Sequence, residues 1–339
     1  MPIEKIYIAR HGFRLNWQWT NFQSVTGLAR DISLTSYGEV QADALAKHIS
    51  SIPEEERPTA IFSSAWYRCL QTSKPIAEAL KLPIYVEQGF GEWFSPAAVG
   101  TGLHPRPGPT SSLHQYFPNL IDTRYDVTWL PSRNGEDVAE IHSRVASFIA
   151  TWFTRLELAE ASKPIKSDEE LNLGRHKNVL FVGHAASIIT LARVLSGDRQ
   201  LAMRTGTCSL SILVPKSDAK WTSAVAIEGD TSGTPRGHAR LGEWSIIQNA
   251  AADFLPNGSE RDWGFEDIEV ADGEVVTDDG ERDTKGEVEQ LSERGLQIDL
   301  ELSEKAQKAV EEEAIEGARG WGYRTAVENA ATVTRGGKL

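Results

Sequence analysis

The sequence predicts an α/β protein, a three-layer sandwich in which helices flank a mostly parallel sheet. Short apolar segments with the pattern of strands alternate with amphipathic segments with the pattern of helices, from Ile3 to Leu195. Such alternation is typical of parallel sheets covered on both faces. Polar residues suited to chemistry directly follow three of these strands, at the ends where open α/β sheets bind ligands.

The first strand is expected at Ile3–Ala9, because this apolar run ends at a turn that contains Gly12. Apolar residues then recur at helical spacing over Ser36–Ser50, and Thr35 before them is a suitable N-cap. The same patterns predict a strand, a helix and a strand at Thr59–Ser63, Trp66–Leu80 and Leu82–Val86.

The segment Ser95–Pro118 holds many of the 15 prolines, which predicts an insertion or lid loop. A long amphipathic helix is expected at Asn134–Glu157, followed by a strand at Asn178–Val182 and a helix at Ala185–Leu195. Antiparallel β additions and a surface loop are predicted further on, the strands at Cys208–Val214, Trp221–Glu228 and Glu243–Ala250 and the loop at Gly229–Gly237.

We expect one catalytic domain over residues 1–265, followed by an acidic linker and tail over 266–339 with at most one helix, at Leu300–Ala318. The formal net charge is −13, and residues 271–320 alone contain 16 acidic and 6 basic residues. The remainder is therefore nearly neutral and lacks the basic stripe of a protein that binds nucleic acid directly. The acidic tail is suited to a basic partner or to keeping the chain in solution.

Composition also indicates which cellular compartment and which cofactors to expect. Two cysteines in 339 residues do not form a disulfide framework, which favours a reducing compartment. No signal peptide and no run long enough to span a membrane is visible, so we expect a cytoplasmic or nuclear protein without a membrane partner. No metal or other cofactor is expected, because the histidines outside the strand ends, His104, His114, His142 and His176, lack the spacing of metal ligands.

The residues at the strand ends are suited to phosphoryl transfer. This reaction needs positive charge around the transferred group, and an arginine holds two phosphate oxygens at once. A histidine kept neutral by neighbouring arginines is a good nucleophile, and a buried carboxylic acid protonates the leaving oxygen. The candidates are His11 as the nucleophile, Arg10, Arg14, Arg68 and His184 as phosphate-binding groups, with His184 also counted as catalytic, and Glu92 as the acid.

Several assignments stay open at this stage. The assignment of Glu92 as the acid is open, because Glu87 lies near it in the sequence and because a carboxylate in a loop is usually solvated. Glu136 and Arg144 are expected to be a structural pair or solvent-facing charges. Five aromatic residues either line the mouth of the pocket or belong to the core, namely Trp17, Trp19, Trp66, Trp93 and Phe94.

Four ordered blocks resemble the histidine phosphatase, or phosphoglycerate mutase-like, superfamily. They are Ile6–Arg14, the block from Leu34 to Ala42, the block from Ser64 to Thr72, and Val182–His184. The resemblance implies a phosphoglycerate mutase-like fold and the site residues given above, with a phosphohistidine formed on His11. Phe13-Arg14 stands where mutase-type members have Glu-Ser, which favours a phosphatase over a phosphomutase.

A narrower resemblance is to the phosphatase domain of the fungal 55-kDa tau subunit of the RNA polymerase III factor TFIIIC. It rests on further blocks, such as Gly89–Phe94, Thr205–Leu210 and Phe254–Phe265, while the last 70 residues are unlike the β-rich domain that follows in the yeast-type subunit. The sequence thus predicts a phosphomonoester hydrolase that acts on a phosphorylated small molecule or a phosphoprotein. The alternative is an assembly or regulatory subunit with a protein partner in a transcription complex.

Overall fold

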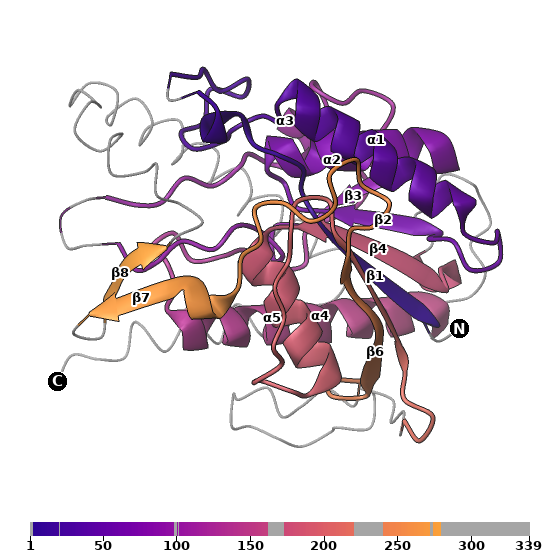
Figure 1. Ribbon diagram of the computed structural model, residues 1–339. Helices are drawn as coiled ribbons and strands as arrows, with labels where there is room; N and C mark the ends of the chain where they lie inside the picture. The colour runs from indigo at the N-terminus through magenta and orange to yellow at the C-terminus, as the bar shows by residue number, and fades with distance from the viewer. Residues whose placement is uncertain are drawn as a thin grey trace, which may run out of the picture.

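A six-stranded mixed sheet forms the centre of the protein (Figure 1). The structure is a computed structural model, and it describes residues 3–19, 21–97, 100, 102–161, 173–219, 240–271 and 274–278. Four strands are parallel, in the spatial order β3 (Ile84–Val86), β2 (Ala60–Ser63), β4 (Asn178–Gly183) and β1 (Lys5–Arg10). Two antiparallel strands, β5 (Leu210–Pro215) and β6 (Trp244–Ala251), extend the sheet beyond β1. The predicted α/β class and these antiparallel additions are confirmed.

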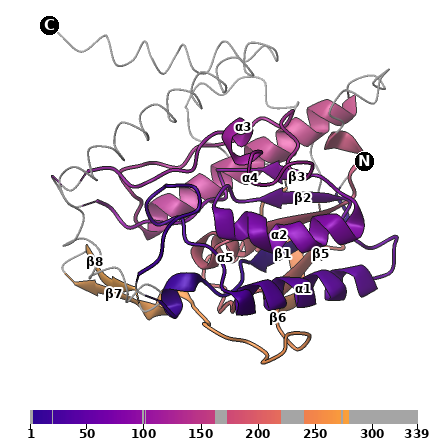
Figure 2. The ribbon, with the colours of Figure 1, turned by 90° about the horizontal axis from the view of Figure 1, so that it is seen from above.

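Helices cover both faces of this sheet (Figures 1 and 2). One face carries α1 (Ser36–Ser51) and α2 (Tyr67–Leu80), and the other carries α4 (Val138–Ala161) and α5 (Ala185–Ser196). Because side chains alternate along a strand, β1 supplies Ile6 and Ile8 to the core under α4 and α5, whereas Tyr7 and Ala9 join the core under α1 and α2. The chain thus has two apolar cores with the sheet between them.

The N-terminus of the long helix differs from the prediction of Asn134–Glu157. Gly135 has a φ of +81°, and a Cβ there would lie 2.6 Å from the Ser95 carbonyl carbon, so the backbone at this point is left-handed and passes close to Ser95. Helix α4 begins at Val138 instead. Just before it, the Asp137 side chain accepts from the Glu140 backbone nitrogen at 2.7 Å, and the Glu140 side chain accepts from the Asp137 backbone nitrogen at 2.8 Å. This capping box sets the start of the helix.

The proline-rich segment 95–118, expected to be an insertion or lid, contributes to a core. It contains one short helix, α3 (Thr110–Leu113), and the buried side chains Leu113 and Phe117 pack in the core under α1 and α2. The second half of the segment is therefore fixed to the body of the domain.

The predicted linker begins with regular structure. The 3-10 helix Phe265–Asp267 leads into an antiparallel pair of strands, β7 (Ile268–Ala271) and β8 (Glu274–Asp278). Phe265 and Ile268 pack against the core on the side of α4, so the folded unit continues past residue 265. The strand expected at Trp221–Glu228, the loop at Gly229–Gly237 and the helix at Leu300–Ala318 lie outside the described residues. No helix in the described part of the chain is long and apolar enough to cross a membrane.

Candidate active site

The two histidines of the candidate site lie at the carboxyl ends of neighbouring parallel strands. His11 follows β1 and His184 follows β4, and these strands pair in register with Arg10 opposite Gly183. The His11 nitrogen donates a backbone hydrogen bond to the Gly183 carbonyl at 2.9 Å. The imidazole centroids are consequently 5.4 Å apart, and both rings are almost fully buried. The sheet register thus brings together two residues that are 173 positions apart in the chain.

The hydrogen bond of the His11 ring fixes which nitrogen carries the proton. Nδ1 lies 2.8 Å from the carbonyl oxygen of Gly12. A carbonyl oxygen only accepts, so Nδ1 is the protonated donor and Nε2 keeps its lone pair in the neutral ring. Burial lowers the pKa of His11 well below its ordinary value, and the nearby Arg68, His184, Arg10 and Arg14 lower it further. At neutral pH the ring is therefore uncharged.

Three buried arginines supply positive charge around His11. Arg10 donates from Nη1 to the carbonyl oxygens of Thr205 at 2.7 Å and Arg261 at 2.5 Å, which fixes its position. Arg14 lies with its guanidinium carbon 4.5 Å from the centre of the Trp17 ring. Arg68, at the start of α2, is 1% exposed, and among the described residues its Nε and Nη1 have no hydrogen-bond partner. Because unsatisfied buried donors are costly, Arg68 is ready to bind anionic oxygens.

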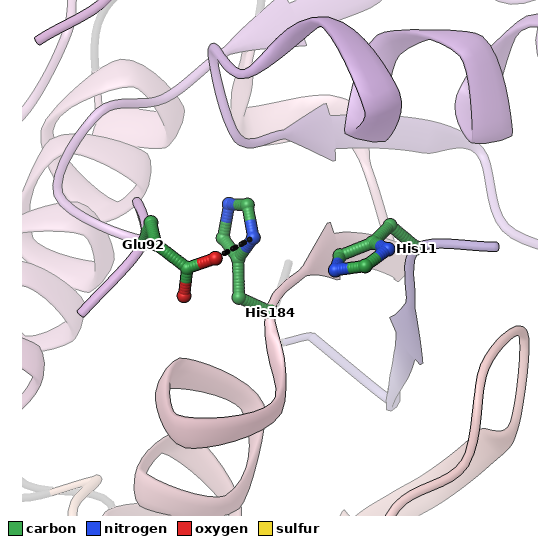
Figure 3. Close-up of side chains that lie close together, drawn as sticks. All are labelled: His11, Glu92 and His184. Carbon is green, nitrogen blue, oxygen red and sulfur yellow. Dashed lines mark ion pairs between the residues drawn. The ribbon is translucent and has the colours of Figure 1, made fainter. Parts of the chain in front are cut away.

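Glu92 and His184 form the other side of the site (Figure 3). Glu92 Oε2 accepts from Arg68 Nη2 at 2.5 Å and lies 3.1 Å from His184 Nδ1. Burial raises the pKa of Glu92, but His184, Arg68 and Arg14 outweigh this effect and hold the pKa well below its ordinary value. Burial lowers the pKa of His184 to about 4, against the opposing effect of Glu92. In the free site Glu92 is thus ionised and His184 is neutral.

All six residues predicted from the sequence therefore meet at one place, and the arrangement suits an anion. Ligand atoms of His11, Glu92 and His184 lie within 4.8 Å of one another, a spacing that is geometrically able to hold a metal ion. The positive charges of Arg10, Arg14 and Arg68 favour a phosphate-like group instead and oppose a divalent cation.

Some residues at the site were not identified from the sequence. Ser64, after β2, lies with its hydroxyl 2.8 Å from His184 Nε2. Arg261 supports Arg10 through its carbonyl, although 251 positions separate the two residues, and its own guanidinium lies 5.1 Å from the centre of the Trp17 ring. No local pattern marks Arg261, because its place depends on the path of the chain after β6.

A hollow of about 390 Å³, open to solvent, is lined in part by Glu92, and His11 is not among its lining residues. Trp66 and Phe94 form part of its wall, along with Glu136 and several prolines. Of the other aromatic candidates, Trp17 lies 6.2 Å from His11 between ring centres, Trp93 is buried in the core, and Trp19 is 64% exposed. Glu87, the alternative to Glu92, is buried away from His11, where it accepts from Tyr125 and the nitrogens of Gly89 and Thr128.

Comparisons with known proteins show which family this chain resembles. Residues 6–227 match the model of the histidine phosphatase superfamily (branch 1). The chain is 31% identical over 284 residues to the transcription factor tau 55 kDa subunit of Saccharomyces cerevisiae, covering 80% of this chain and 60% of the length of that relative. Similar solved structures include a mycobacterial glucosyl-3-phosphoglycerate phosphatase (19% identity, 73% of this chain and 98% of that one, TM-score 0.41) and the ecdysone phosphate phosphatase of Bombix mori (16%, 62% and 88%, TM-score 0.47).

Proposed function

This chain belongs to the histidine phosphatase superfamily, and we propose that it hydrolyses phosphomonoesters through a phosphohistidine on His11, without a metal ion. The observation that carries the proposal is the state of His11. Its ring is buried and neutral, its Nδ1 proton is held by Gly12, and Nε2 is left as a nucleophile among three arginines.

Substrate binding uses the positive charge of the site. The phosphoryl oxygens accept hydrogen bonds from Arg10, Arg14 and Arg68, with Arg68 supplying its two buried donors without a partner. His184 also binds the phosphoryl oxygens, and hydrogen bonds to Ser64 and Arg68 hold its ring in position. These contacts place the phosphorus in line with His11 Nε2 and stabilise the charge that spreads over the oxygens in the transition state.

In the first step, His11 Nε2 forms a bond to phosphorus while the bond from phosphorus to the ester oxygen breaks. Glu92 gives its proton to the departing oxygen, so an alcohol or phenol leaves. In the second step, water attacks the phosphorus and Glu92 takes a proton from it. The bond between nitrogen and phosphorus breaks, which releases inorganic phosphate and returns His11 to its neutral form.

The ionised state of Glu92 in the free site agrees with this cycle. A phosphomonoester monoanion brings one proton into the site, because its second pKa is about 6. The charge of the bound phosphoryl group offsets that of Arg68 and repels the carboxylate, which raises the pKa of Glu92. The proton therefore passes to Glu92, and the leaving oxygen receives it from there.

The direct test is hydrolysis of para-nitrophenyl phosphate across pH 4 to 8 with a chelator present, for the parent protein and for His11→Ala. We expect turnover by the parent and its loss in the variant, with the folded state of both checked by circular dichroism. A His11→Ala variant that retains the parent rate would overturn the proposed mechanism.

A second role as a subunit of a transcription factor is favoured by the yeast relative, whose name describes it as such a subunit. We propose that this chain also associates with other subunits of TFIIIC in the nucleus, since a phosphatase site and an assembly role are compatible in one chain. Purification of the tagged chain from its own cells tests this role. Recovery of those subunits in stoichiometric amounts is expected, and their absence would contradict it.

A further inference from the structure

We propose that the buried pair Glu136–Arg144 positions Glu92, the proposed proton donor, and so controls proton transfer to the leaving group. This inference rests on the proposed function, because it assigns two residues to the support of one step in that reaction. The sequence alone indicated only a structural pair or solvent-facing charges at these positions.

Arg144 holds the backbone on both sides of Phe90, just before Glu92. It lies in α4, is 5% exposed, and donates from Nη1 to the carbonyl oxygens of Gly89 at 2.9 Å and Gly91 at 3.3 Å. The two carbonyls share one guanidinium nitrogen, so the turn that leads into Glu92 keeps one shape. Lysine in its place would keep the charge but would lose the planar group that binds Glu136 and this turn at once.

Glu136 fixes Arg144 and the other end of the same segment. Its carboxylate accepts from Arg144 Nε at 2.7 and 2.8 Å, which aligns the guanidinium. Its backbone carbonyl accepts from Trp93 Nε1 at 2.7 Å, and its backbone nitrogen donates to the Phe94 carbonyl at 2.8 Å. The residues on both sides of Glu92 are thus tied to one buried ion pair.

The position of Glu92 matters because its carboxylate has two neighbours that compete for it. Oε2 is bonded to Arg68 and lies close to His184, and the hollow that Glu92 lines is also lined by Glu136. A proton donor must come within about 3 Å of the leaving oxygen. If the segment 89–94 were held less firmly, Glu92 would stay bonded to Arg68 and would not reach the leaving oxygen. Proton donation would then weaken, while His11 and the arginines would stay in place.

The test compares leaving groups, because a purely structural role would not distinguish them. Phenyl phosphate releases a phenol with a pKa of about 10, like that of a tyrosine, and needs the proton, whereas para-nitrophenyl phosphate releases a far more acidic phenol. The kcat/KM values of both substrates are measured for the full-length parent, Arg144→Lys and Glu136→Gln. The Glu92→Gln variant gives the effect of removing the proton donor altogether.

Arg155→Lys is the matched control, since it makes the same change on the same helix. Arg155 donates to the Asp126 carbonyl at 2.6 Å and the Thr128 hydroxyl at 2.8 Å, and it makes no contact with the segment 89–94 in the described structure. We expect this control to change both substrates by the same factor.

For Arg144→Lys and Glu136→Gln we expect phenyl phosphate hydrolysis to fall at least about tenfold more than para-nitrophenyl phosphate hydrolysis, in the direction of Glu92→Gln. If Arg144→Lys does not fold, Glu136→Gln, which is close in shape to the parent residue, decides the question. Equal losses on both substrates, or no loss, would overturn the positioning role alone. A parent protein that hydrolyses neither substrate would instead overturn the proposed function.

Discussion

His11 shows how local contacts set the charge state and the tautomer of a histidine. A free histidine has a pKa near 6.5 and is partly protonated at neutral pH, in which state it has no lone pair for attack on phosphorus. Burial and four neighbouring cationic or titratable groups lower the pKa of His11, and the Gly12 carbonyl fixes its tautomer. The ring that we propose as the nucleophile is therefore uncharged at pH values where a solvated histidine would be charged.

This charge state predicts the shape of the pH profile. A lowered pKa keeps His11 neutral as the pH falls through 6.5, so the acid side of the profile should not drop there. Above about pH 6 the phosphomonoester loses the proton that the leaving group needs, and the rate should fall about tenfold per pH unit. We expect kcat/KM for phenyl phosphate to be flat between pH 5 and 6 and to fall at higher pH. A decline below pH 6.5 would show that His11 titrates like a solvated histidine.

The six candidate residues that the structure brings together could be predicted from the sequence because each follows a strand or lies in a recognisable block. The contacts that set the tautomers and positions of these side chains could not be predicted from the sequence. The Gly12 carbonyl at His11 and the Ser64 hydroxyl at His184 depend on backbone geometry. Arg261 reaches Arg10 only because the chain returns to the site after β6. Such contacts leave no periodic signal.

At the scale of elements, the start of α1 packs against the loop that carries His11 and Arg14, two of the candidate site residues. Thr35 caps the helix by accepting from the Gly38 nitrogen at 2.9 Å, and its own nitrogen donates to the Phe13 carbonyl at 2.9 Å. Gly38 lies directly against that loop, where a Cβ would be 2.9 Å from the Phe13 nitrogen and closer still to the Phe13 oxygen. The glycine is thus required for close packing.

Gly38→Ala should therefore lower the stability, against the trend of helix propensity. Alanine favours a helix by about 1 kcal/mol over glycine, but forced contact with backbone costs about 1–3 kcal/mol. We expect a lower free energy of unfolding in urea and a lower kcat, since Phe13 lies between His11 and Arg14 in the chain. Val40→Ala, at a half-exposed position of the same helix, is the control and should leave both values nearly unchanged. A Gly38→Ala protein as stable as the parent would contradict the close approach.

Most elements could be predicted because their patterns are local. The helix of α1 and its cap at Thr35 are confirmed, as are the strands on both sides of α2. The start of α4 was predicted four residues too early because its apolar periodicity does not reveal the left-handed backbone at Gly135. The hairpin after Phe265 was missed because its strands are short and acidic residues interrupt their β-branched ones, in a region whose overall composition suits a linker.

At the scale of the molecule, the site is assembled from nearly the whole described chain. Its side chains run from Arg10 to His184, and the segment after β6 adds the carbonyl of Arg261. Trp263 in that segment is 3% exposed and exchanges backbone hydrogen bonds with Thr205, at 3.0 and 3.2 Å. The segment therefore acts as a support for Arg10, far beyond the strands that carry the histidines.

Two truncations test this role of the segment. A chain that ends at Asp278 keeps every contact described at the site, so we expect it to retain the activity of the full chain. A chain that ends at Ala251 loses Arg261 and Trp263, and we expect at least about a tenfold lower kcat together with a lower melting temperature. Loss of activity in the chain that ends at Asp278 would show that residues beyond 278 contribute to catalysis.

The measurement that tests the central claim most directly is the capture of the covalent intermediate. The Glu92→Gln variant, which should accumulate it by slowing attack of water, is mixed with para-nitrophenyl phosphate and quenched in alkali, where phosphohistidine is stable. Peptide mass spectrometry then locates the phosphoryl group. The account predicts one phosphoryl group on the peptide that contains His11, and none after His11→Ala. Turnover with the phosphoryl group on another residue would contradict it.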